Sequence, residues 1–216
     1  MTAKLPNTSD RTTVIGSTGS GKTQFSVFLL SSRDFHLRPW FIFDYKGDKL
    51  LAKIGAKEIG LKTFPKEPGL YIIRPLPGEE ELVSAFFLKC WERENVGIYI
   101  DEGYMLPKND RWFRACLTQG RSKHIEIITC SQRPVFLDKF VFTETGFFAI
   151  FNMNYLEDRK HVAAYLDNRK PSLLPKYECL WYNVSDQHSA QFKPVPETSE
   201  LVKKFQIRLS KKTTRI

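Results

Sequence analysis

The chain has 216 residues, of which 42% are hydrophobic, and this is enough to build one well-packed α/β domain. Its 33 Lys and Arg residues outnumber 24 Asp and Glu residues, and the formal net charge of +9 suggests a polyanionic partner, nucleic acid before an anionic membrane surface, although charge alone fits a merely soluble basic protein equally well. The four cysteines are widely spaced and form no C-x-x-C pair, which excludes a zinc framework or a disulfide scaffold and indicates a reducing compartment.

Membrane insertion is not expected from the hydropathy of the chain. Residues 1–11 are polar and do not resemble a secretory signal peptide. The longest apolar stretch, residues 140–151, contains Glu144 and is too short to cross a bilayer. We therefore expect an intracellular protein that is not itself transmembrane.

Residues 16–23 have the sequence GSTGSGKT and match the phosphate-binding loop (Walker A) pattern G-x-x-x-x-G-K-[ST] without a mismatch. The β-branched residues 12–15 before it predict a short buried strand, and the apolar residues 24–30 after it predict a helix. In this context backbone N–H groups surround phosphates, Lys22 reaches the β- and γ-phosphates, and the Thr23 hydroxyl binds Mg²⁺. The pattern therefore predicts a nucleoside triphosphate, ATP or GTP, bound by Gly16, Ser17, Thr18, Gly19, Ser20, Gly21, Lys22 and Thr23.

Residues 40–43 form a continuous apolar run, which is typical of a parallel strand covered on both faces. A polar turn, DYKGD, follows directly, and ligands of open α/β sheets bind at the carboxyl ends of strands. Asp44 and Lys46 are therefore candidates for positions near the nucleotide, although a helix cap followed by a basic surface turn explains them equally well. A short strand at 71–73 is expected next, then a helix that begins at the acidic residues 79–81.

Residues 96–100 predict another buried strand, which leads directly into Asp101 and Glu102. Two acids at the tip of an apolar strand suit Mg²⁺-dependent hydrolysis. Asp101 would hold the metal through water or together with Thr23, and Glu102 would orient and deprotonate the attacking water. The alternative is that the two acids simply begin a loop.

The chain beyond Glu102 continues to alternate helices and strands. Asn109 can cap a helix, and the following strand at 125–129 ends close to Gln132. A Gln amide beside a γ-phosphate could report its presence by exchanging hydrogen-bond partners. Further strands are expected at 146–151 and 180–182, and a further helix at 156–166.

The chain is expected to form a single P-loop ATPase domain over residues 1–216, with a core at about 12–167. Residues 168–216 form a C-terminal extension with a basic tail and no acid after Glu200. Such a tail can contact a phosphate backbone or remain solvated and disordered, and the first interpretation is slightly favoured. Its basic residues are Lys203, Lys204, Arg208, Lys211, Lys212 and Arg215.

Four motifs in order, GSTGSGKT, FIFDYKGDK, VGIYIDE and QGRSKHIEIITCSQRP, together resemble the FtsK/HerA superfamily of ring-forming DNA-pumping ATPases. The resemblance covers roughly residues 12–154. The small size makes the chain similar to the genome-packaging ATPases of tailless, membrane-containing double-stranded DNA viruses. The resemblance implies a RecA-like α/β fold, a mostly parallel sheet flanked by helices on both faces, with ATP and Mg²⁺ as cofactors.

The resemblance also implies a homo-oligomeric ring, expected to be a hexamer, with nucleotide at the subunit junctions. Arg121 would reach the neighbour's γ-phosphate, and Arg114 is the second candidate for this role. The alternative is that Arg121 is only a solvated cation at a helix end. Gln132 would be the sensor, Asp101 the metal-associated Walker B acid and Glu102 the catalytic base. The implied partners are double-stranded DNA and a viral capsid vertex or membrane components, which places the chain in the host cytoplasm and at the virion vertex.

Larger members of the superfamily carry extra domains for docking or DNA orientation, for which this chain has little room. Docking would then use the surface of the core or the basic tail. Residues 134–146, with Lys139 and the aromatic Phe136, Phe140 and Phe142, are a candidate for a DNA-gripping pore loop. A hairpin or helix that packs its aromatic residues inward is the favoured interpretation of this segment.

The leading hypothesis is an ATP-driven double-stranded DNA translocase that packages a viral genome into a preformed capsid. A small P-loop nucleotide kinase is a second possibility, disfavoured because the acid pair and Gln132 suit activation of water better than phosphoryl transfer to a nucleotide. A nucleotide-dependent assembly or export factor of the filamentous-phage type ranks third, because such proteins usually carry a membrane-spanning segment.

Overall fold

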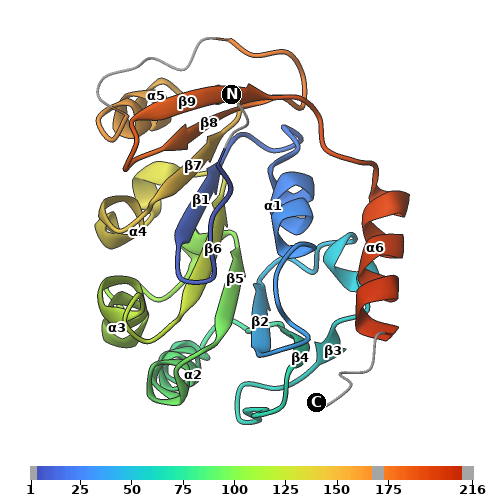
Figure 1. Ribbon diagram of the computed structural model, residues 1–216. Coiled ribbons are helices and arrows are strands. Elements are labelled where there is room, and N and C mark those ends of the chain that lie inside the picture. The colour runs from blue at the N-terminus through green and yellow to red at the C-terminus, as the bar shows by residue number, and fades with distance from the viewer. Residues whose placement is uncertain (1–3, 167–172, 211–216) are drawn as a thin grey trace.

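The computed structural model describes residues 4–166 and 173–210, which are built around a nine-stranded sheet in the order β3-β4-β2-β5-β6-β1-β7-β8-β9 (Figure 1). Neighbouring strands from β3 to β7 pair in parallel, whereas β7 with β8 and β8 with β9 pair antiparallel. The strands are β1 (Arg11–Ile15), β2 (Pro39–Asp44), β3 (Lys57–Glu58), β4 (Gly69–Ile73), β5 (Gly97–Asp101), β6 (Glu126–Ser131), β7 (Phe147–Ile150), β8 (Cys179–Asn183) and β9 (His188–Phe192).

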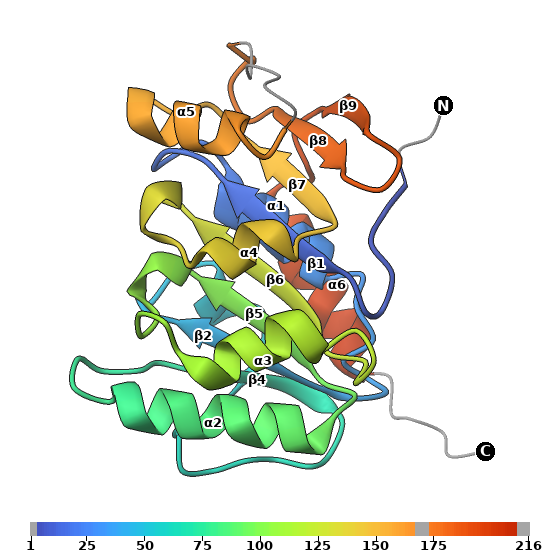
Figure 2. The same ribbon diagram turned by 90° about the vertical axis from the view of Figure 1, so that its left-hand side faces the viewer.

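Helices cover both faces of this sheet (Figures 1 and 2). On one face lie α1 and α6, and on the other lie α2, α3, α4 and α5. The helices are α1 (Lys22–Leu30), α2 (Glu80–Arg93), α3 (Arg111–Gln119), α4 (Lys139–Thr143), α5 (Leu156–Ala163) and α6 (Thr198–Ser210), with short 3₁₀ turns η1 (Leu51–Lys53), η2 (Gly103–Met105) and η3 (Pro134–Phe136). The expected α/β fold, a mostly parallel sheet between two helical layers, is confirmed.

The alternation of side chains along β2 shows how one strand supports both layers. Phe41 and Phe43 pack beneath α2 and α3, whereas Trp40 and Ile42 pack on the face that carries α1 and α6. All four side chains are fully buried. The prediction from the continuous apolar run, a strand covered on both faces, is therefore confirmed.

The C-terminal part of the described chain is built into the same sheet. The expected strand at 180–182 is β8, while β9 was not predicted, because its sequence HSAQF has little apolar character. In α6, Leu201 and Phe205 are buried, and the Phe205 ring stacks on Phe35 with 5.7 Å between centroids. Lys203, Lys204 and Arg208 thus belong to a packed helix, whereas Lys211, Lys212 and Arg215 lie outside the described residues.

Two local expectations are corrected by the structure. Asp110 caps α3, because its carboxylate accepts the Phe113 N–H at 2.6 Å, whereas Asn109 lies in the preceding turn with φ of 59°. The helix expected at 156–166 is shorter, since α5 ends at Ala163.

A buried ion cluster connects the start of β6 to the segment between α1 and β2. Glu126 Oε2 lies 2.7 Å from Arg38 Nη2, and its Oε1 lies 3.0 Å from Arg33 Nε. All three side chains are buried. Arg38 Nε also pairs with Asp34 Oδ1 at 2.7 Å, so the cluster contains two guanidinium groups and two carboxylates.

We expect Glu126→Gln to lower the free energy of unfolding by about 3 kcal/mol, because the buried Arg33 loses its counter-charge and Arg38 keeps only that of Asp34. The measurement is chemical denaturation followed by circular dichroism. Glu157→Gln is the control: Glu157 forms an exposed pair with Lys160, and its loss should cost no more than about 1 kcal/mol. Equal small losses in both variants would show that the buried cluster adds nothing to stability.

Candidate nucleotide-binding site

The loop of residues 16–23 connects β1 to α1 with its backbone amides turned inward. Gly21 precedes α1 with φ of 101°, and Gly19 has φ of 76°, conformations that favour glycine. Within the described residues the amides of Gly19, Gly21 and Lys22 have no acceptor, and the Ser20 hydroxyl is buried without a partner. Unpaired donors at a helix N-terminus form an anion site, so the residues present fit a phosphate group.

Neighbouring strand ends hold this loop in place. The Gly16 N–H donates to the Ser131 carbonyl at 3.3 Å, and the Ser17 N–H donates to the Asn152 carbonyl at 3.0 Å. A Cβ on Gly16 would lie 2.6 Å from the Phe151 Cβ, so glycine is required at this contact. The loop is thus fixed by the segments that follow β6 and β7.

Asp101 is the last residue of β5 and lies beside Thr23 in the first turn of α1. Its Oδ1 lies 3.5 Å from the Thr23 hydroxyl and accepts the Tyr99 hydroxyl at 3.1 Å. Burial raises the pKa of Asp101 to about 7, and the neighbouring charges of Glu102 and Asp48 add to this. A divalent cation would offset this concentrated negative charge.

The described residues contain no group of three or more His, Cys, Asp or Glu side chains that could hold a metal by themselves. Thr23 and Asp101 therefore fit Mg²⁺ only in the manner usual for phosphate-bound Mg²⁺, with few protein ligands and the rest from water and phosphate.

Glu102 follows β5 in a left-handed conformation, with φ of 61° and ψ of 61°. This turn places its buried carboxylate beside two lysines: Oε1 lies 3.4 Å from Lys22 Nζ and 2.8 Å from Lys46 Nζ. Its Oε2 accepts the backbone N–H of Gln132 at 3.1 Å. The expected base after β5 and the phosphate-binding lysine after β1 are therefore brought together across the end of β6, which lies between these two strands.

The Gln132 side chain connects two sides of the site. Its carbonyl oxygen accepts the hydroxyl of Thr18 in the loop, and its amide nitrogen donates to the Tyr104 hydroxyl at 3.2 Å. A change at the phosphates can therefore reach Tyr104 through one amide group, as the sensor hypothesis requires. Tyr104 is not predictable from the sequence, since an aromatic residue in the loop after an acid pair carries no specific signal.

The two candidates after β2 have different environments. Lys46 contacts Glu102, so its expected position near the nucleotide is supported by the structure. Asp44 accepts the Asp48 N–H at 3.0 Å and pairs with Arg74 at 3.2 Å, so it closes the turn after β2, while Asp48 accepts the N–H groups at the start of η1. Burial opposes the charge of Lys46, but the hydrogen bond to Glu102 outweighs it and raises the pKa of Lys46.

Arg121 lies far from the phosphate-binding loop of its own chain. It follows α3 and precedes β6, whereas the loop follows the carboxyl end of the parallel neighbour β1. Its charge lies near Arg11 at the start of β1. The pKa of Arg11 is lowered, mainly by burial and next by the positive charge of Arg121. Arg121 is exposed and sits at the sheet edge opposite the site.

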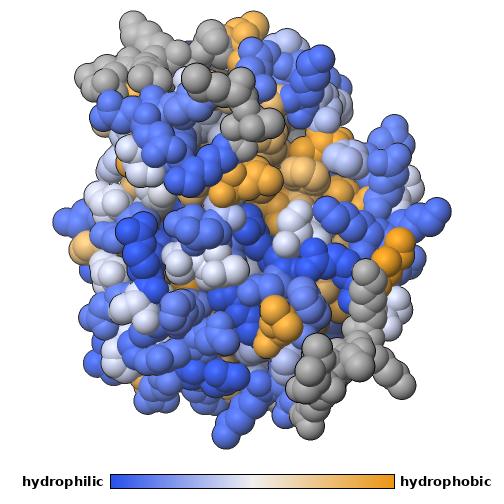
Figure 3. Space-filling view, in the orientation of Figure 1, coloured by the Kyte–Doolittle hydropathy of each residue, from blue (hydrophilic) through white to orange (hydrophobic). Residues whose placement is uncertain are grey.

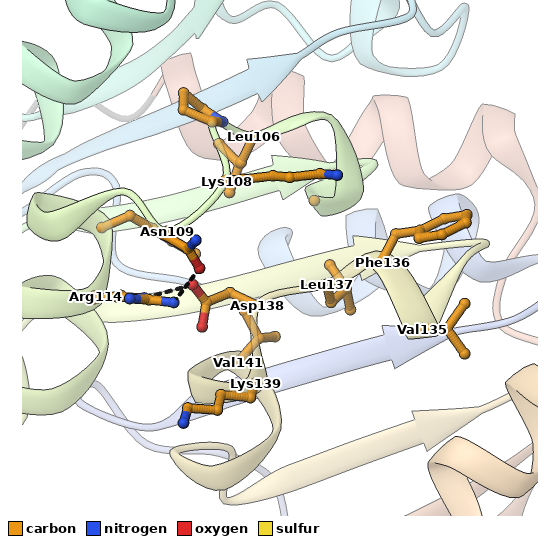
Figure 4. Close-up of a pocket in the computed structure, with 13 residues that line it drawn as sticks. Leu106, Lys108, Asn109, Arg114, Val135, Phe136, Leu137, Asp138, Lys139 and Val141 are labelled. Carbon is orange, nitrogen blue, oxygen red and sulfur yellow. Dashed lines mark hydrogen bonds and ion pairs between the residues drawn. The ribbon is translucent and has the colours of Figure 1, made fainter.

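Arg114 lines a cleft of about 470 Å³ between the segments that follow β5 and β6 (Figure 4). Asp138 accepts its Nε at 2.6 Å and Asn109 accepts a second hydrogen bond, so this guanidinium is already held within the chain. In the same segment, 134–146, Phe142 is buried as the inward-packing interpretation predicted, whereas Phe136 is exposed at the rim.

The chain matches no model of a known protein family. It is 37% identical over 227 aligned positions to the DNA packaging ATPase P9 of Enterobacteria phage PRD1, and the alignment covers 99% of this chain and 100% of the relative. The chain belongs to the family of this packaging ATPase. The resemblance to viral packaging ATPases is thereby confirmed.

Solved structures show the same fold at low sequence identity. The genome packaging NTPase B204 of Sulfolobus turreted icosahedral virus 2, in complex with AMPPCP, has a TM-score of 0.69 at 19% identity, covering 88% of this chain and 100% of B204. ATPases 2 and 3 of EssC from Geobacillus thermodenitrificans have a TM-score of 0.67 at 15% identity, covering 93% of this chain and 44% of that one. The fold of the packaging-ATPase family is thus shared with part of a longer ATPase chain.

Proposed function

We propose that the chain hydrolyses ATP to move double-stranded DNA into a viral capsid. The observation that carries this proposal is the position of Glu102, a buried carboxylate 3.4 Å from the phosphate-binding Lys22 and hydrogen-bonded to Gln132. A base at this position can act on a water molecule that attacks a bound γ-phosphate. The full-length similarity to a packaging ATPase supports the coupling of this reaction to DNA.

The residues of the site have distinct tasks in this reaction. The loop amides bind the phosphates, and Lys22 turns from Glu102 to the β- and γ-phosphates. Thr23 and Asp101 would hold Mg²⁺, which when bound neutralises the charge that develops on the phosphates. Glu102 accepts the proton of the water, and Gln132 passes the state of the phosphates to Tyr104.

We also infer that the chain works as a ring, a hexamer in our proposal, with Arg121 facing the nucleotide of the next subunit. Its place at the edge opposite its own loop supports action in trans. Among the described helices none has the length and hydrophobicity to cross a bilayer. Association with a capsid vertex or membrane components, in the host cytoplasm and in the virion, would then use the surface of the domain.

We expect linear double-stranded DNA to stimulate ATP hydrolysis regardless of its sequence. Because phosphate contacts release counterions, the apparent DNA affinity should fall by roughly 10³-fold between 50 and 200 mM salt if about six phosphates are contacted. The measurement is ATP turnover against DNA concentration at several salt concentrations, with two DNAs of different composition. Turnover that ignores DNA, or an affinity that ignores salt, would contradict the proposal.

A further inference from the structure

Both carboxylate oxygens of Glu102 have partners. Lys22 and Lys46 share Oε1, at 3.4 and 2.8 Å, and Oε2 accepts the Gln132 N–H at 3.1 Å. A general base needs an oxygen within hydrogen-bond reach of the proton it takes. In this arrangement Glu102 is held in place but cannot offer an unshared oxygen to water.

Different anions can compete with Glu102 for the two lysines. The Lys22 side chain is 7% exposed and belongs to the phosphate-binding loop, so the phosphates of ATP are its competitor. The Lys46 side chain is 40% exposed, lies in the turn after β2 and makes the shorter contact to Glu102. ATP can therefore draw Lys22 away, whereas Lys46 is released only by an anion that arrives from outside.

Exposed lysines in the segments after three neighbouring strands indicate the chemistry of that anion. They are Lys46 and Lys49 after β2, Lys108 after β5 and Lys139 after β6. Figure 4 shows Lys108 and Lys139 on two sides of the cleft, with Asp138 turned to Arg114 and thereby neutralised. Several exposed cations in segments that follow neighbouring strands suit the regularly repeated phosphates of a DNA backbone.

We propose that Lys46 is a positioning residue that holds Glu102 until a DNA phosphate displaces it, so that contact with DNA permits hydrolysis. This inference rests on the proposed DNA-translocating function and specifies how the partner acts on the site. When Lys46 pairs with a phosphate and Lys22 with ATP, Glu102 Oε1 becomes free to accept a proton. The Gln132 N–H continues to fix Oε2, so the carboxylate keeps its orientation.

The test is ATP turnover of Lys46→Met with and without linear double-stranded DNA. Met keeps the unbranched stem and removes the ammonium group. Loss of one charge-assisted hydrogen bond should raise the DNA-free rate about tenfold and bring the ratio of stimulated to basal rate towards one. Lys46→Arg should restore most of the wild-type ratio. Lys66→Met, which changes an exposed lysine before β4 at the opposite edge of the sheet, should keep both wild-type rates.

A second measurement needs no hydrolysis. In DNA binding without nucleotide, Lys46→Met should reduce the slope of log affinity against log salt by about one, because one phosphate contact is lost. An unchanged slope would overturn the inference and point instead to an anion such as an acidic side chain of a second copy.

Two turnover results would also overturn the inference. Wild-type rates in Lys46→Met would show that Lys46 does not restrain Glu102, and loss of turnover with and without DNA would show that hydrolysis needs it. In both cases stimulation of the wild type by DNA leaves the proposed function standing. A wild type that neither binds DNA nor responds to it contradicts the proposed function itself.

Discussion

Glu102→Gln is expected to lower the rate of ATP hydrolysis by about 10²- to 10⁴-fold while nucleotide binding persists. Gln has the size of Glu and can still accept the Gln132 N–H, but it cannot take a proton from water. Its neutral side chain also leaves Lys22 free for the phosphates, so affinity for ATP should not fall. Single-turnover phosphate release and titration with a fluorescent ATP analogue measure the two quantities separately.

The control for this variant is Glu92→Gln, a change of the same kind at an exposed position on α2. It should hydrolyse ATP at the wild-type rate. Thermal unfolding of both variants checks that the buried exchange leaves the fold intact. If folded Glu102→Gln turned over within a few-fold of wild type, another group would have to activate the water, and the assignment of the base would be wrong.

The central part of the site was predictable because its residues lie at the ends of strands. Parallel strands end at one edge of a sheet, so any polar residues that directly follow apolar runs meet there. This reasoning applies to Asp101, Glu102 and Gln132 and to the loop after β1. Their distances to Thr23, Lys22 and Thr18 show that they converge as expected.

Contacts that depend on strand order were not predictable in the same way. Lys46 reaches Glu102 because β2 lies beside β5, with Asp44 in register with Asp101. Apolar runs in a sequence predict that two strands exist, but they do not predict that the two strands are neighbours. A position of Lys46 near the nucleotide was therefore only one of two equally favoured interpretations.

The remaining differences between the predicted and the observed elements depend on local chemistry. Asn109 and Asp110 are adjacent and both residue types can cap a helix, so composition could not choose between them. In β9 the side chains are only partly covered, and a half-covered edge strand needs few apolar residues. In the basic helix α6 only Leu201 and Phe205 are buried, and the hydrophilic side chains that predominate on the surface, blue in Figure 3, make this short apolar pattern hard to recognise in the sequence.

Arg121→Ala should lower ATP turnover by roughly 10³- to 10⁵-fold in the assembled protein if the residue acts as an arginine finger. The structure places Arg121 before β6 and the nucleotide site after β1, so within one chain the two lie at opposite edges of the sheet. A finger at this position can serve only the site of a neighbouring subunit. The control is Arg93→Ala, an exposed arginine at the end of α2 on the same edge, which should keep wild-type turnover.

Mixing two inactive proteins distinguishes action in trans from a structural role. A subunit with Arg121→Ala keeps its base, and a neighbour with Glu102→Gln keeps its arginine, so their junction contains one complete site. In an equal mixture that exchanges subunits freely, about a quarter of head-to-tail junctions have this composition, and turnover should recover towards that fraction. Two results would contradict this role: no recovery of turnover in rings shown to be mixed, or an Arg121→Ala protein as active as wild type. In either case Arg121 would be only a solvated cation at the end of α3, and the shared active site would need another arginine.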